Sequence, residues 1–210
     1  MNGPNINVKR VILAAVVLFF LSVIKTGIAA DAAKTKPVME GKEKTDRSIV
    51  LNYVVDAPPE KVFELWSTVE GTRKFFGADA VIDLKPGGAY EIYFFPRTDP
   101  KSDINSTKGA ILMWMEKGKE LAFEWTMPPF AGELNVKPLP TWVEVSFRPL
   151  KNNRDKTSIR VAHHGFKRGG KWDKCYEFFV RSWARILYSL DLFCSGMTLE
   201  WPFLKYQAKK

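Results

Sequence analysis

The stretch Asp56-Ala-Pro-Pro-Glu-Lys-Val-Phe-Glu-Leu-Trp66 turns an extended segment into a short helix. Residues 47–55, just before it, are rich in β-branched and aromatic side chains, which favours a strand. Pro58 and Pro59 suit the first positions of a helix, where a missing backbone N–H group does no harm. Apolar residues then recur at helical spacing and are expected to face inward: Val62, Phe63, Trp66 and Val69.

The chain after this helix alternates between predicted strands and polar connections. Gly71 is expected to end the helix, and residues 72–76 to form one more short helical turn. In Lys85-Pro-Gly-Gly88, proline at the second position and glycine at the third fit a type II turn between two strands. Residues 96–107 and 128–140 are predicted loops, and the second is long enough to fold over an opening. The predicted strands after the first are residues 78–84, 89–95, 109–116, 120–127, 142–149 and 157–164.

The last predicted element is one amphipathic helix of more than twenty residues. Gly196 is well placed to end it. A single long helix after a run of antiparallel strands predicts an α+β fold, in which the sheet packs against the helix. The apolar stripe of this helix recurs every 3.6 residues through Trp172, Tyr176, Phe179, Trp183, Ile186 or Leu187, Leu190 and Phe193.

The first thirty residues have the pattern of a secretory signal. Lys9 and Arg10 supply a positive start, residues 11–24 are almost wholly apolar, and small residues come next. Fourteen helical residues reach about 21 Å at ~1.5 Å each, short of a ~30 Å hydrocarbon core. We therefore predict an exported protein, periplasmic or secreted, with a cleavable signal. The main alternative is a membrane anchor formed by residues 11–30, and a buried core helix is the other.

Charge and composition characterise the chain beyond the predicted signal. The formal net charge of +9 includes Lys9, Arg10 and Lys25, and no acidic residue precedes Asp31, so removal of the signal leaves +6. This charge favours anionic surfaces without specifying nucleic acid, which is not an expected partner of an exported protein. The predicted segments are a signal peptide at 1–30, a flexible linker at 31–46, one domain at 47–196 and a C-terminal tail at 197–210.

Four motifs occur in an order and spacing that resemble a known superfamily. They are Ala57-Pro-Pro-Glu-Lys-Val-Phe63, Lys85-Pro-Gly-Gly88, Glu120-Leu-Ala-Phe-Glu-Trp125 and Thr157-Ser-Ile-Arg-Val-Ala-His-His-Gly165. Together with the closing Trp-rich helix, they make the chain similar to the START-like SRPBCC superfamily. More closely, the chain resembles the branch named for activators of the heat-shock-protein-90 ATPase, over about residues 47–194.

This resemblance implies a helix-grip fold, in which a curved antiparallel sheet of six to seven strands wraps the C-terminal helix around an internal pocket. Members of the superfamily bind lipids, sterols, polyketides and other apolar molecules, and a few catalyse reactions inside the pocket. The chaperone-activator role belongs to eukaryotic cytosolic proteins with an extra N-terminal domain. Because this chain has a predicted export signal and no room for that domain, we do not expect the role to transfer.

Inward-facing aromatic residues form the candidate ligand site. They are compatible either with a filled core or with a pocket for a flat or chain-like apolar ligand, and the implied fold favours the pocket. The predicted ligand-binding residues are Trp66, Phe76, Tyr90, Trp125, Phe147, His163, Phe179 and Trp183.

The two histidines are adjacent, so they point to opposite faces of a strand and cannot readily share a metal ion. His163 faces inward, matches the strand histidine of the resembled branch, and hydrogen-bonds either a ligand carbonyl or a core partner. The inward-facing acid–base candidates are His163 and Tyr90. Glu124 or Glu144 would join them only if the assignment of alternate strand residues to the inner face is shifted by one residue. We predict no catalytic residue, no metal and no cofactor.

Three functions fit these observations. The leading hypothesis is an exported protein that holds a small hydrophobic molecule, such as a lipid or polyketide, between sheet and helix. The alternatives are a cyclase- or hydrolase-like enzyme that uses the same cavity, and a partner-binding or chaperone-modulating module. The sequence does not predict the identity of the ligand or the oligomeric state. It predicts contact with a membrane only through an uncleaved signal segment.

Overall fold

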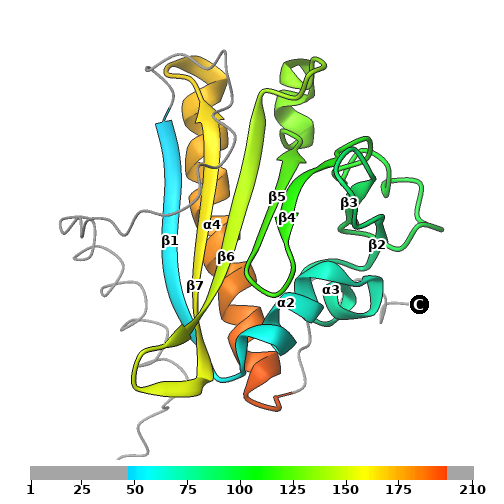
Figure 1. The fold of residues 1–210 in the computed structure, drawn as a ribbon. Coiled ribbons are helices and arrows are strands. Elements are labelled where there is room, and N and C mark those ends of the chain that lie inside the picture. The colour runs from blue at the N-terminus through cyan, green and yellow to red at the C-terminus, as the bar shows by residue number, and fades with distance from the viewer. Residues whose placement is uncertain (1–46, 198–210) are drawn as a thin grey trace, which may run out of the picture. The chain divides into compact units, whose positions relative to one another are not determined.

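The computed structural model describes residues 47–197. Within these residues the chain forms seven strands, three α-helices and one 3-10 helix (Figure 1). In chain order they are β1 (Arg47–Val55), α2 (Pro59–Ser67), α3 (Val69–Phe75), β2 (Asp79–Ile82), β3 (Tyr90–Tyr93), β4 (Leu112–Glu116), β5 (Glu120–Trp125), η2 (Pro129–Leu134), β6 (Thr141–Leu150), β7 (Asn153–Phe166) and α4 (Gly170–Cys194).

The strands confirm the predicted α+β class and divide into two antiparallel groups. Five strands form one sheet in the order β1-β7-β6-β5-β4, while β2 and β3 pair with each other. The family resemblance implied one curved sheet of six to seven strands. Residues 105–111 bond to the other edge of β3, as Thr107 N does to Ile92 O at 2.9 Å. Gly109 lies within this segment with a φ of +81°, and β4, which follows it, pairs with β5 in the large sheet.

Helix α4 lies along the inner face of the large sheet (Figure 1). It spans 25 residues, which agrees with the predicted length. It ends as expected, because Gly196 comes just after the last turn with a φ of +78° and its N–H group donates to Phe193 O. The buried side chains of its apolar stripe are Cys175, Phe179, Trp183, Ile186, Leu187 and Leu190.

The prediction that Gly71 ends the first helix was wrong. Helix α2 ends at Ser67, and the hydroxyl of Thr68 then caps α3 by accepting a bond from Gly71 N at 3.0 Å. Gly71 lies inside the first turn of α3, where a Cβ atom would come within 2.5 Å of Leu65 Cα. Glycine is therefore present because the two helices approach closely, and not because the chain stops there.

Other predicted boundaries were close. The Lys85–Gly88 turn is confirmed, since Gly87 has a φ of +83° and Gly88 N donates to Lys85 O at 2.8 Å. Strand β7 runs over Asn153–Phe166, so it begins earlier than the predicted strand at 157–164. The predicted loop at 128–140 contains η2.

Three predictions concern residues that the structure does not describe. The signal peptide at 1–30, the linker at 31–46 and all but the first residue of the tail lie outside residues 47–197. Among the described residues, no helix combines the length and the apolar character needed to cross a membrane.

Candidate functional site

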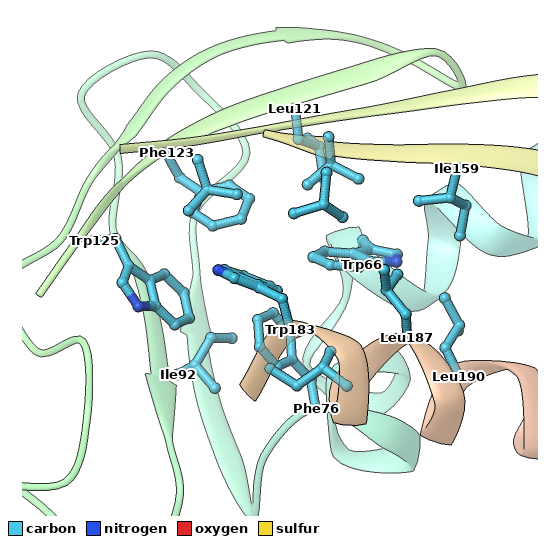
Figure 2. Close-up of a cluster of buried hydrophobic side chains, with 14 of the residues drawn as sticks. Trp66, Phe76, Ile92, Leu121, Phe123, Trp125, Ile159, Trp183, Leu187 and Leu190 are labelled. Atoms are coloured by element: carbon cyan, nitrogen blue, oxygen red, sulfur yellow. The ribbon is translucent and has the colours of Figure 1, made fainter. Parts of the chain in front are cut away.

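A closely packed aromatic cluster fills the centre of the space between sheet and helix. Trp183 of α4 is fully buried, with its ring centroid 5.1 Å from that of Trp125 and 5.8 Å from that of Phe76. Trp66 of α2 stacks on it at 6.3 Å, and Figure 2 shows these rings together. The centre of this interior is therefore a core of interlocking rings, and not an open hollow.

The structure buries all eight side chains predicted to bind a ligand. Five of them are buried and do not line the pocket described below: Trp66, Phe76, Tyr90, Phe147 and His163. The other three combine burial with a place in the wall of a pocket: Trp125, Phe179 and Trp183. For all eight, contact with a ligand remains a prediction.

The pocket has a volume of about 210 Å³ and lies beside the aromatic cluster. One wall is the face of α4 that carries Phe179, Trp183 and Ile186. The opposite walls are the end of β5 with the residues after it, 125–129, and the segment 104–107 that precedes β4. The pocket thus lies where the long helix, the sheet and two loops meet.

The mouth of the pocket is apolar. Ile104 is 65% exposed and Phe178 is 38% exposed, although both line the pocket. Phe130 of η2 packs against Phe178 with ring centroids 5.8 Å apart. Exposed apolar side chains gathered around an opening are typical of a ligand or partner site. Sequence reasoning missed them, although Ile104 and Phe130 are conspicuous as large apolar residues inside predicted loops.

His163 has an unusual hydrogen-bonding state. It is fully buried, and the indole Nε1–H group of Trp183 donates to its Nδ1 atom at 3.0 Å. Because an indole N–H group only donates, we infer that the neutral ring carries its proton on Nε2. That Nε2 atom has no hydrogen-bond partner among residues 47–197. The rings of Phe166 and Phe179 pack against the imidazole at 4.5 and 4.8 Å.

Burial lowers the pKa of His163 well below its usual value, and the nearby His164 lowers it further. The imidazole is therefore neutral at pH 7. His164 points to the opposite face of the sheet, as predicted, where its Nδ1 atom lies 2.7 Å from Ser48 Oγ and its ring stacks on Trp142. In residues 47–197, no group of three or more His, Cys, Asp or Glu side chains is arranged to hold a metal ion.

The other acid–base candidates interact with protein groups outside the pocket. The Tyr90 hydroxyl donates to Trp66 O at 2.7 Å, and burial raises the pKa of this phenol. Glu124 pairs with Lys137 at 2.8 Å, and Glu144 lies 4.0 Å from His164 on the outer face. Among the described residues, Arg185 is the one charged side chain that lines the pocket. This geometry suits binding with exclusion of water better than proton transfer.

These features define an α+β helix-grip protein with an apolar pocket beside its long helix. The sequence matches the family model described as "Activator of Hsp90 ATPase homolog 1-like protein" over residues 56–193, which is more than half of the chain. The chain belongs to this family, within the START-like SRPBCC superfamily, and the resemblance read from the four motifs is confirmed. No curated protein matches the sequence.

Several solved structures are similar in fold. A protein from Mesorhizobium loti aligns with a TM-score of 0.54 and 15% identity, covering 73% of this chain and 100% of that one. The AHSA1-like protein from Rhizobium etli aligns with a TM-score of 0.50 and 19% identity, covering 78% and 92%. The Aha1 dimer from Colwellia psychrerythraea aligns with a TM-score of 0.50 and 16% identity, covering 70% and 94%. At these identities the likeness shows the fold alone.

Proposed function

We propose that this protein binds a small hydrophobic molecule in the pocket between α4, the end of β5 and residues 104–107. The observation that carries the proposal is the 210 Å³ cavity with mostly apolar walls, beside the closely packed aromatic cluster. Membership of a superfamily whose proteins bind hydrophobic ligands supports it. Sites for small molecules are typically concave and apolar with few polar groups.

The size of the cavity restricts the ligand. Pockets for drug-sized molecules typically have volumes of about 300–1,000 Å³, so 210 Å³ suits one or two rings or a short chain. Burial of about 200 Å² of apolar surface gains roughly 5 kcal/mol at about 25 cal/mol per Å², before ordering costs. That gain is close to the ~4 kcal/mol of a millimolar Kd. A longer ligand that also covers the exposed Ile104 and Phe178 side chains binds more tightly.

Native mass spectrometry of protein purified from its source tests the proposal. We expect a bound small hydrophobic molecule on a fraction of the protein. Repeated recovery of empty protein, with no thermal shift from a panel of lipids and polyketides, would count against binding.

A variant that fills the pocket tests its location. Ser182 lines the cavity, and its hydroxyl is used only in a bond to Phe178 O at 2.9 Å within α4. We expect Ser182→Phe to abolish binding of any ligand that the wild type retains, without unfolding the protein. Lys174→Phe is the matched control, because Lys174 is an exposed residue of the same helix that does not line the pocket. Equal retention of ligand by both variants would place the site elsewhere.

We also propose that the protein acts outside the cytosol, as the signal-like pattern of residues 1–30 suggests. N-terminal sequencing of the protein from secreted, soluble and membrane fractions tests this proposal. We expect a soluble product that begins near Asp31. A product that retains Lys9 and Arg10 in the membrane fraction would support the anchor instead.

A further inference from the structure

The neutral polar side chains of the pocket are already used by the fold. Each hydrogen-bonds to a backbone group: the Thr126 hydroxyl donates to Ser106 O at 2.9 Å, and Thr107 Oγ1 accepts from Ile92 N at 2.8 Å. Asn105 and Ser106 bond to backbone carbonyls within their own loop. These groups hold the pocket walls in place, so they are poor candidates for recognition of a ligand.

Arg185 differs from all of them. It is exposed, it lines the pocket from α4, and its guanidinium makes no hydrogen bond or ion pair with any described residue. Arg73, by contrast, pairs with Asp79 at 2.6 Å. No Asp or Glu among residues 47–197 lines the pocket. The positive charge at this mouth is therefore not neutralised from within the cavity.

The neighbouring charges on α4 add to this effect. Arg181 lies four residues before Arg185, so the two guanidinium groups are neighbours on the helix surface, an arrangement that is slightly destabilising. Glu177 lies four residues before Arg181, and within the described part of the chain it forms no ion pair with either arginine. An anion bound at the mouth would relieve this repulsion.

We propose that the ligand is an amphipathic carboxylate, whose short apolar part fills the cavity and whose carboxylate pairs with Arg185 at the mouth. The inference rests on the proposed binding function and names its ligand class. A guanidinium matches a carboxylate through two parallel N–H···O bonds. Because Arg185 is exposed, the anion stays partly hydrated, which avoids most of the cost of burying a charge.

Octanoate and 1-octanol are suitable probes, because they carry chains of equal length and differ in charge. Binding to the full-length protein is measured by isothermal titration calorimetry and by intrinsic tryptophan fluorescence, to which Trp125 and Trp183 in the pocket wall contribute. We expect Arg185→Gln to weaken octanoate binding about fivefold and to leave the affinity for octanol unchanged. A fivefold loss is at the upper end of the range for a partly exposed ion pair. Added salt should weaken octanoate binding to the wild type and not octanol binding.

Arg160→Gln is the matched control. It removes the same charge from an exposed position on the outer face of β7, and it should affect neither probe. If both probes bind the wild type and Arg185→Gln changes neither affinity, the carboxylate inference is overturned while the pocket function stands. If neither probe binds, or if Ser182→Phe leaves octanol binding intact, the proposed pocket function fails as well.

Discussion

The aromatic cluster and the pocket beside it are built from the same elements, yet they differ in packing. In the cluster, the rings of Trp66, Phe76 and Trp183 lie within contact of one another and leave no room for a ligand. In the pocket, the same helix face lies opposite the end of β5 and two loop segments, and a cavity remains between them. Trp183 belongs to both regions. Close packing therefore makes the cluster the source of stability, while the space left by the loops makes the pocket the proposed binding site.

The largest effect should come from Trp183, which belongs to both regions. Trp183→Ala removes a fully buried indole and leaves the Nδ1 atom of His163 without its donor. We expect a loss of about 3–5 kcal/mol in the free energy of unfolding, measured by urea denaturation. A loss below about 1 kcal/mol would show that the cluster does not stabilise the fold.

The next effect concerns pH and the interior of the cluster. Because the pKa of His163 is lowered in the folded state, the unfolded chain takes up a proton at a pH where the folded chain does not. The contribution of the neutral His163 side chain to stability is therefore complete above about pH 6.5. It is lost as the pH falls, by at most about 1.4 kcal/mol per pH unit.

Urea denaturation between pH 7.5 and 5 measures this slope. We expect His163→Gln to remove part of this slope, and His164→Gln to have a smaller effect, because burial is the larger cause of the lowered His163 pKa and His164 the smaller one. Identical slopes for the wild type and His163→Gln would contradict a neutral buried imidazole.

A smaller change tests one polar contact of the cluster. Tyr90→Phe removes the hydroxyl that donates to Trp66 O and keeps the buried ring, which stacks on Phe123 at 4.1 Å. Thermal and urea unfolding should show a loss of about 0.5–1.5 kcal/mol, and ligand binding should not change, because Tyr90 does not line the pocket. A change in ligand affinity at unchanged stability would extend the site into the cluster.

The smallest effect on stability should come from the mouth of the pocket. Phe178 is partly exposed and its ring packs on Phe130, so Phe178→Ala should cost less than about 1 kcal/mol of unfolding free energy. The same change should weaken ligand binding severalfold, because it removes apolar surface at the opening. A large loss of stability would mean that this rim belongs to the core.

Local patterns predicted much of the fold. The stripe on α4, the two prolines at the start of α2 and the Pro-Gly-Gly turn each depend on a few neighbouring residues, and all three were read correctly. Gly71 was misread because its role is a contact between two helices. The division of the strands into five and two could not be predicted either, because residues 105–111 pair with β3 only in the folded chain.

The sequence by itself determined which side chains face inward, because strand alternation and helical spacing sort residues onto faces before any packing occurs. It therefore predicted Trp125, Phe179 and Trp183, the three members of the candidate site that do line the pocket. Only the tertiary structure decided which part of the interior is filled and which is open. That distinction depends on ring-to-ring distances and on how loops such as residues 104–107 settle against α4, which no local pattern encodes.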